Sequence, residues 1–259
     1  MSRSWLSPCK EIASSLLELI YPSVCAGCGR EMPGQDALIC SDCLHQIPRI
    51  QPPLCPQCGA PLSAPPDPTG KRCRFCPPGP HFFQQSRSLY SYKDPRVKNL
   101  VHALKFRYQT GVAAPLSRLL SYGFDFYFSK MNIDALAPVP LHKSRLRERE
   151  FNQAALLCGE ISRRRRIPIR EDLVYRRRRT PPQASLHPET RMKNLEDAFF
   201  PVEENAAAGL RVLIVDDVMT TGATINAVSK ALRRAGAEAV FALTLALTID
   251  LPARSSDSL

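Results

Sequence analysis

The fold of this chain is decided by the stretch Val212-Leu-Ile-Val-Asp-Asp-Val-Met-Thr-Thr-Gly-Ala-Thr224. Its first four residues are apolar and three of them are β-branched, which is typical of a central strand in a parallel sheet covered on both faces. Residues 221–235 then have the pattern of a helix that stops at Gly236. A short turn, rich in hydroxyls and glycine, therefore joins the strand to the helix.

This turn has the properties of an anion site. Free backbone N–H groups at the amino end of a helix, together with the helix dipole, favour a phosphate. Asp216 and Asp217 would repel that phosphate, so we expect them to accept hydrogen bonds from neighbouring hydroxyls of the sugar that carries it. The pattern predicts a site for a ribose 5-phosphate. The alternative is a plain doubly wound domain in which the paired acids merely end a strand.

The same stretch resembles the motif with which type I phosphoribosyltransferases bind 5-phosphoribosyl 1-pyrophosphate (PRPP). The resemblance implies that Asp216 and Asp217 are the catalytic-site carboxylates that hold the ribose 2′- and 3′-hydroxyls, with Mg²⁺ accompanying PRPP. It also implies that the 5′-phosphate is bound by Thr220, Thr221, Gly222, Ala223 and Thr224.

Eight of the ten cysteines form four Cys-x-x-Cys pairs, which are Cys25/Cys28, Cys40/Cys43, Cys55/Cys58 and Cys73/Cys76. Two residues between thiolates is the spacing that presents both sulfurs to a tetrahedral zinc ion, and four such ligands close a structural site. The sequence thus predicts two all-cysteine Zn²⁺ sites. A disulfide framework is the alternative, but such bridges do not persist in a reducing compartment.

A repeat indicates which pairs share a metal. Cys25-Ala-Gly-Cys-Gly29 recurs as Cys55-Pro-Gln-Cys-Gly59, and each copy is followed by a second pair that lacks the glycine. The glycine permits the positive φ that turns backbone amides toward the sulfurs. We therefore predict sequential pairing, with the first two pairs on one zinc and the last two on the other. A crossed-brace pairing is the alternative.

Periodicity predicts an α/β fold. The expected strands are 88–92, 135–139, 173–176 and 239–247, in addition to the one at 212–215, and the expected helices are 95–106, 113–128 and 151–163 besides the one at 221–235. This alternation indicates a mostly parallel sheet flanked by helices, preceded by a small double zinc-ribbon module. The predicted parts are an N-terminal helix over 1–22, the ribbons over 23–80, the sheet domain over 87–250 and a disordered tail over 251–259.

Composition limits the class of protein. The chain has 259 residues, of which 44% are hydrophobic, so it is long enough for one α/β core and a smaller module. No apolar run reaches the ~18 residues that span a bilayer. The apolar spacing over residues 5–20 is interrupted by charges and precedes no small-residue cleavage site, so we expect a helix and not a signal peptide.

The positive charge is concentrated. The formal net charge is +11, and residues 142–193 hold fifteen Lys or Arg against six Asp or Glu. Within them, a segment that leaves a predicted strand end carries Lys143, Arg145, Arg147 and Arg149. This basic loop is predicted to neutralise a pyrophosphate beside the ribose, with a solvated face as the alternative. The runs 163–166 and 176–179 fit a solvated face and contact with nucleic acid equally well.

Further motifs resemble the ComF family. They are Val101-His-Ala-Leu-Lys-Phe106, the stretch from Pro138-Val-Pro-Leu-His142 to Phe151-Asn-Gln-Ala154, and Arg179-Thr-Pro-Pro-Gln183 with Leu186 and residues 191–194. The resemblance implies a cytoplasmic protein that takes part in natural competence and DNA uptake, with single-stranded DNA and DNA-uptake proteins as partners. It also implies a flexible loop that closes over PRPP through Arg179, Gln183, Arg191 and Asn194. Glu150 departs from the family, which usually has glycine there.

Two hypotheses of function follow. In the first, the chain is a PRPP-binding zinc protein that engages single-stranded DNA during uptake. In the second, it is a true phosphoribosyltransferase that acts on an unidentified base or nucleotide. Thr220 stands where purine-salvage relatives carry an acid, so the sequence shows no base for an acceptor and leaves catalysis open.

Overall fold

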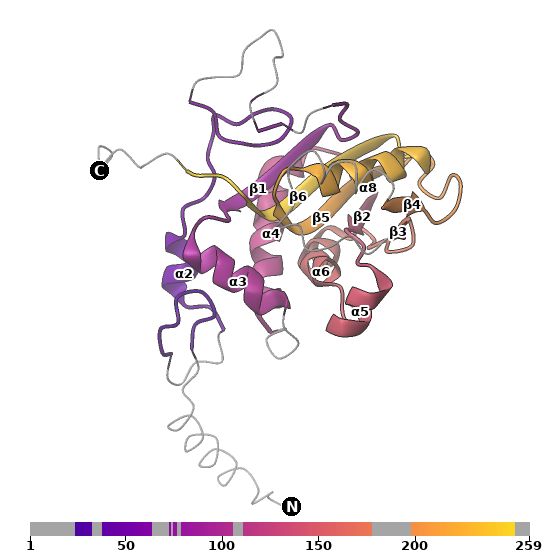
Figure 1. Cartoon of the computed structure of the whole chain (residues 1–259). Coiled ribbons are helices and arrows are strands. Elements are labelled where there is room, and N and C mark those ends of the chain that lie inside the picture. The colour runs from indigo at the N-terminus through magenta and orange to yellow at the C-terminus, as the bar shows by residue number, and fades with distance from the viewer. Residues whose placement is uncertain are drawn as a thin grey trace, which may run out of the picture.

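The computed structural model describes residues 24–32, 38–63, 73, 75–76, 79–105, 111–177 and 198–251 (Figure 1). The helices are α2 (Ser41–Gln46), α3 (Pro95–Lys105), α4 (Ala113–Phe128), α5 (Lys143–Arg149), α6 (Gln153–Arg165) and α8 (Ala223–Arg234). The strands are β1 (Gln85–Ser91), β2 (Ala135–Pro138), β3 (Val174–Arg176), β4 (Phe199–Pro201), β5 (Arg211–Met219) and β6 (Ala239–Leu247). The predicted helix over 1–22 and the tail over 252–259 lie outside the described residues.

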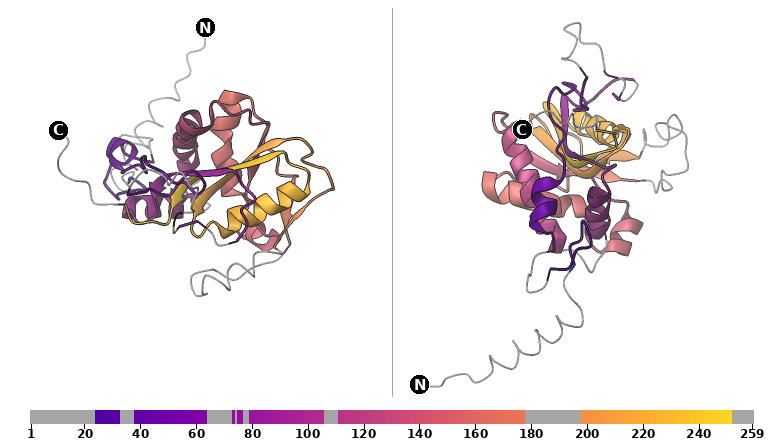
Figure 2. Two further views of the ribbon diagram at one scale, coloured as in Figure 1. Left: turned by 90° about the horizontal axis from the view of Figure 1, so that it is seen from above. Right: turned by 90° about the vertical axis from the view of Figure 1, so that its left-hand side faces the viewer.

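A four-stranded parallel sheet forms the centre of the molecule, in the order β1-β6-β5-β2. Leu213 and Val215 of β5 pack with α4 and α6 on one face, whereas Val212 and Ile214 pack with α8 on the other (Figure 2). All four side chains are fully buried. The prediction of a parallel sheet covered on both faces is confirmed.

The sheet opens where β2 ends. Pro138, the last residue of β2, is aligned with Val215, and the Val139 amide donates to the Val215 carbonyl at 3.0 Å. β5 continues to Met219 because β6 keeps pairing with it, with Asp216 opposite Thr244. The strand is therefore longer than the predicted 212–215, and both aspartates lie inside it. Among the described residues, no strand pairs with β5 beyond Val215 on the β2 side, and ligand crevices of parallel sheets lie at such strand ends.

One predicted strand does not belong to the parallel sheet. β3, expected at 173–176 as a member of that sheet, pairs antiparallel with β4, and Arg176 lies opposite Phe199. Its partner is β4, a strand that the helix and strand pattern did not predict. The resulting two-stranded sheet carries Arg176 toward the end of β5, as described below.

The ribbon segments are built into the same core. The Ile50 amide donates to the Leu89 carbonyl at 2.8 Å, and the Ser86 amide donates to Gln57 at 2.7 Å. Cys43 shares an apolar cluster with Leu100 of α3. The double ribbon is thus in extensive contact with β1 and α3. Within the described part of the chain, no helix has the length and apolar character needed to cross a membrane.

Candidate functional site

Asp216 and Asp217 lie side by side on β5 at the open end of the sheet. Asp217 is buried, with 6% exposure, and Asp216 is half-buried. The Asp217 amide donates to Asp216 Oδ1 at 2.9 Å, which fixes the Asp216 side chain close to the backbone. The predicted acid pair is therefore preorganised before any ligand is bound.

Lys105 reaches the pair from another element. It is the last residue of α3, and its Nζ lies 3.1 Å from Asp217 Oδ2, with 28% and 8% exposure of the two side chains. The angles at this contact do not make a hydrogen bond, so the interaction is an ion pair. Lys105 belongs to the 101–106 motif quoted above, but sequence reasoning gave it no role because 112 residues separate the two partners.

The carboxyl group of Asp216 has a strongly raised pKa. Burial, followed by the negative charge of Asp217, raises the pKa of Asp216 from its ordinary value of 3.8 to about 8. The Asp217 amide and the charges of Lys105 and Arg176 act in the opposite direction. Because two adjacent carboxylates in a low dielectric cannot both ionise easily, the neutral form of Asp216 predominates at pH 7.

The charges of the acids act on two arginines, Arg149 and Arg176, and the charge of Arg145 acts on both of these. Burial lowers the pKa of Arg149, and the charge of Asp217 counteracts this more than any other group, while Arg145 lowers the pKa further. Burial also lowers the pKa of Arg176, where Asp216 counteracts it and Arg145 again adds to the lowering. Arg149 and Arg176 are therefore each repelled by Arg145 and attracted by the acids. An anion between Arg145, Arg149 and Arg176 would relieve this repulsion.

The predicted basic loop is a short helix. Lys143, Arg145, Arg147 and Arg149 lie on α5, which begins after His142, whose Nδ1 accepts from the Ser144 amide at 3.2 Å. The sequence predicted a loop here because the charged residues of this segment show no apolar periodicity. Within α5, the charge of Arg149 acts on both aspartates, whereas Arg145 also pairs with Glu148 at 3.2 Å.

Glu150 ends α5 in the left-handed conformation, with φ of 66°, and its amide donates to the Leu146 carbonyl at 2.7 Å. Positive φ is the conformation that glycine adopts without cost. This explains why glycine suits position 150 in the ComF family. In this chain Glu150 adopts the same conformation, so the turn that ends α5 is kept.

The predicted phosphate turn leads into α8. Gly222 caps this helix with φ of 76°, and α8 begins at Ala223, two residues later than expected. The Thr221 Oγ1 accepts from the Ala223 amide at 3.4 Å. Thr220 is exposed, Thr221 and Thr224 are half-buried, and the twelve-residue helix directs its positive end toward the crevice. The predicted loop residues Arg179, Gln183, Arg191 and Asn194 lie outside the described residues.

The run 163–166 does not join this site. Arg163 pairs with Glu160 at 2.7 Å, and Arg165 pairs with Asp125 at 2.5 Å, at the far end of α6. Arg176, by contrast, comes from a run that looked equivalent in sequence. No pattern in the sequence distinguished the two runs, because the difference lies in where β3 is placed.

The eight cysteines of the ribbons form two groups of four, and within each group the Sγ atoms lie within 4.8 Å of one another. The first group is Cys25, Cys28, Cys40 and Cys43, and the second is Cys55, Cys58, Cys73 and Cys76. This is the sequential grouping that the repeat predicts. Cys55 Sγ and Cys76 Sγ are 3.7 Å apart. That distance is close to the edge of about 3.8 Å in a tetrahedron with Zn–S bonds of ~2.3 Å, and it is far longer than a disulfide bond of ~2.05 Å. The donor sets suit two structural zinc ions.

Each first pair forms the same turn. Gly29 and Gly59 have φ of 74° and 71°, and their amides donate to the carbonyls of Cys25 and Cys55 at 2.8 and 3.0 Å. The positive φ predicted from the repeat is therefore present in both copies. Burial raises the pKa of the Cys25 thiol, but amide groups around its sulfur outweigh burial and lower the pKa to about 6. A thiolate, the metal-binding form, is thereby favoured.

Comparisons with known proteins agree with both halves of this geometry. A family model described as a double zinc ribbon domain matches residues 16–77, and one described as a phosphoribosyl transferase domain matches residues 153–257. The phosphoribosyltransferase-like fold and the N-terminal ribbons are thus confirmed. A crystal structure of an adenine phosphoribosyltransferase is 18% identical and covers 52% of this chain and 71% of its own, with a TM-score of 0.34, which is too low to carry an argument.

Several relatives are similar over most of their length. DNA utilization protein YhgH of Escherichia coli (strain K12) is 34% identical over 237 residues, which is 89% of this chain and 100% of the relative. Competence protein F of Haemophilus influenzae is 32% identical over 78% of this chain and 87% of its own. Competence protein ComFC of Bacillus subtilis is 31% identical over 81% of this chain and 84% of its own.

Proposed function

Because the chain belongs to the ComF family of competence and DNA-utilization proteins, we propose that it is a cytoplasmic protein that binds PRPP and acts on single-stranded DNA taken up by the cell. The observation that carries the first half is the electrostatic coupling of Arg149 and Arg176 to Asp216 and Asp217, with Arg145 acting on both of these arginines. A cluster of mutually repelling cations adjoining two hydroxyl acceptors matches a ligand that joins a pyrophosphate to a sugar.

Each part of PRPP has a counterpart in the site. The amino end of α8, with Thr221 and Gly222, supports the 5′-phosphate through its dipole and backbone amides. The side-chain oxygens of Asp216 and Asp217 accept hydrogen bonds from the two sugar hydroxyls. The three arginines receive the pyrophosphate, whose charge they share. The ligand is therefore held at both ends, and the sugar lies over the end of β5.

Mg²⁺ suits the same site. Carboxylate oxygens and the phosphates of a substrate are the ligands that Mg²⁺ prefers, and Asp216 is half-buried at the crevice. When bound, the ion neutralises the pyrophosphate charge. The eight cysteines hold two Zn²⁺ ions as structural sites, and these take no part in ligand chemistry.

Calorimetric titration with PRPP and Mg²⁺ tests this assignment, with ribose 5-phosphate as the comparison ligand. Arg149→Gln should weaken PRPP binding by about 10- to 100-fold, the cost of losing a charge-assisted hydrogen bond, and should leave ribose 5-phosphate nearly unchanged. Asp217→Asn should weaken both ligands. Arg163→Gln, an exposed arginine paired with Glu160, is the matched control. Equal loss of both ligands in Arg149→Gln would refute the pyrophosphate position.

The role in DNA handling rests on the names of the relatives and on the basic charge of the chain. It predicts salt-dependent binding of single-stranded DNA. If the ribose-phosphate site regulates that binding, PRPP and DNA must change each other's affinity by the same factor. Titrating each ligand in the presence of the other measures this factor, and absent or salt-insensitive DNA binding contradicts the role.

A true phosphoribosyltransferase is the second candidate. The same arginines that hold the pyrophosphate would stabilise it as a leaving group, which favours this reading. It predicts release of pyrophosphate from PRPP with some base or nucleotide acceptor, and loss of that release in Asp216→Ala and Asp217→Ala. If a broad screen of acceptors gives no turnover, the transferase candidate fails and PRPP binding without catalysis is the function that remains.

A further inference from the structure

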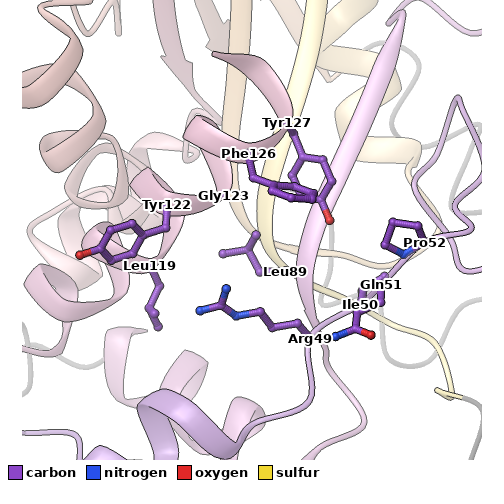
Figure 3. Close-up of a pocket in the computed structure, with 10 residues that line it drawn as sticks. All are labelled: Arg49, Ile50, Gln51, Pro52, Leu89, Leu119, Tyr122, Gly123, Phe126 and Tyr127. Carbon is purple, nitrogen blue, oxygen red and sulfur yellow. The ribbon is translucent and has the colours of Figure 1, made fainter. Parts of the chain in front are cut away.

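A pocket of about 290 Å³ lies on the other edge of the sheet, between the connector of the two ribbons and α4 (Figure 3). It shares no residue with the acid pair or its cations. Its lining comes from three places in the chain: the connector with Arg49, Ile50, Gln51 and Pro52, Leu89 of β1, and Leu119, Tyr122, Gly123, Phe126 and Tyr127 of α4. At the low end of the ligand-pocket range of ~300–1,000 Å³, it suits one heterocycle and not a larger ligand.

α4 carries a second apolar stripe that the core does not use. Leu116, Leu120 and Phe124 face the sheet and are buried, whereas Tyr122 and Phe126, one helical turn apart, point to the pocket side. Phe126 is 72% exposed and Tyr122 is 55% exposed, the highest values for large apolar side chains among the described residues. Two exposed aromatic rings one helical turn apart offer an apolar surface beside the pocket that the core leaves uncovered.

The rings are accompanied by arginines. The Arg164 guanidinium lies over the Tyr122 ring at 5.6 Å, and that of Arg87 lies over Tyr127 at 5.8 Å. Figure 3 shows Arg49 extending from the connector toward Leu119 and Tyr122. Its charge acts on the Tyr127 hydroxyl. Cations stacked on aromatic faces keep those rings in place and give the pocket a positive field.

The local charge is positive after pairing. Arg164 and Arg165 share one carboxylate, that of Asp125, at 3.4 and 2.5 Å. Arg49 is exposed at the opposite side of the pocket. Arginines therefore stand on both sides of the exposed rings, separated by the width of the pocket. Positive charge beside aromatic rings on which bases can stack is the combination that binds single-stranded nucleic acid.

From these observations we infer that the Arg49–Phe126 pocket holds one unstacked base of single-stranded DNA, with its neighbouring phosphates on Arg49 and on Arg164 and Arg165. The inference rests on the DNA half of the proposed function and gives it a location. A flat apolar protein partner would fit the rings but would not need arginines on either side, and a ribose phosphate would not need the rings.

Anisotropy of a labelled oligo(dT) of about 20 nucleotides, added to the zinc-loaded full chain, tests the pocket. Phe126→Ala should weaken binding by roughly 5- to 100-fold, the factor for one base–aromatic stack. Phe126→Tyr, which keeps the ring, should bind nearly as the parent does. Leu156→Ala is the matched control, since Leu156 is an exposed apolar residue of α6 with 37% exposure that lies outside the pocket.

Salt dependence separates the ring from the charges. Phe126→Ala should leave the slope of log K against log[salt] unchanged, because a ring releases no counterion, whereas Arg49→Gln should reduce it by about 0.7. Phe126 is exposed, so the variant should fold, and an unchanged affinity for PRPP confirms that it does. Photo-crosslinking of bromouracil-substituted DNA should label the peptide that contains residues 119–127.

The outcomes are distinguishable. If the parent chain binds no single-stranded DNA, the DNA half of the proposed function and the pocket both fail. If the parent binds but Phe126→Ala binds equally well, the pocket alone is overturned. If Phe126→Ala abolishes self-association in ultracentrifugation while DNA affinity is unchanged, the stripe is a contact between copies of this chain, and the inference is wrong.

Discussion

Replacing Lys105 by methionine removes the positive charge that compensates Asp217 while keeping most of the side-chain volume. Two unit charges 3.1 Å apart attract by roughly 5 kcal/mol at an effective dielectric constant of ~20, but part of this is offset by the cost of removing both from water. Asp217 is only 8% exposed, so its charge would remain buried without its ion-pair partner. Because Lys105 is 28% exposed, we expect a loss of about 1–3 kcal/mol, below the ~3–5 kcal/mol of a fully buried pair.

Thermal unfolding followed by circular dichroism, at fixed free zinc, measures this loss. A destabilisation of about 1–3 kcal/mol corresponds to a decrease in Tm of roughly 3–10 °C for a chain of this size. Lys98→Met is the matched control, since Lys98 lies on the exposed face of the same helix and receives the same substitution. It should change Tm by little.

A double variant isolates the pair. In Lys105→Met/Asp217→Asn no unpaired charge is left, so this variant should be more stable than Lys105→Met alone, and the cycle should give a coupling of about 1–3 kcal/mol. The reasoning fails if Lys105→Met and Lys98→Met have the same Tm. It also fails if adding Asp217→Asn to Lys105→Met lowers the Tm further.

Four other results are expected. The pKa of Asp216 is raised from 3.8 to about 8 in the folded chain, so the free energy of unfolding of the parent falls as the pH rises through this range. Asp216→Asn should therefore have a higher Tm than the parent at about pH 9 and lose that advantage near pH 4. A difference in Tm that does not depend on pH would contradict this. A Cβ at Gly59 would lie 2.5 Å from the Ser86 carbonyl oxygen, whereas one at Gly29 meets nothing within 4 Å, so Gly59→Ala should cost about 1–3 kcal/mol more than Gly29→Ala in urea unfolding, and equal costs would show that the contact is relaxed. Glu150→Gly should stabilise the chain by about 0.5–1 kcal/mol in the same assay by relieving the left-handed conformation, unless that conformation carries no strain. Elemental analysis should find two zinc ions per chain, and one or none would disprove the paired four-cysteine sites.

The parts of the fold that could be predicted are those fixed by local pattern. The expected helix 113–128 and strand 239–247 coincide with α4 and β6, because periodicity is clearest in long, strongly patterned segments. The zinc grouping followed from the repeat, since a glycine with positive φ is a local requirement. The antiparallel pairing of β3 was missed because a three-residue strand has no periodicity from which its partner can be inferred.

Only the contiguous part of the candidate site could be predicted from the sequence, because local pattern does not show which distant residues come together. Asp216 and Asp217 belong to a contiguous motif, and a motif carries its chemistry in adjacent residues. Lys105 and Arg176 reach the acids through the placement of α3 and β3, which is a long-range property of the fold. Arg176 and Arg163 looked alike in sequence, and they differ only because one lies over the crevice and the other forms an ion pair on the surface of α6.

The position of α3 gives the first ribbon a physical part in the acid site. Asn99 on this helix donates its Nδ2 to the Gly27 carbonyl at 2.8 Å, inside the turn that presents Cys25 and Cys28, and Leu100 lies against the same turn. Six residues further along the helix, Lys105 meets Asp217. A helix of eleven residues is a rigid rod about 16 Å long, so fixing its first half against the ribbon also fixes the depth at which Lys105 enters the crevice. The contact between the first ribbon and α3 therefore helps to hold Lys105 in place beside Asp217.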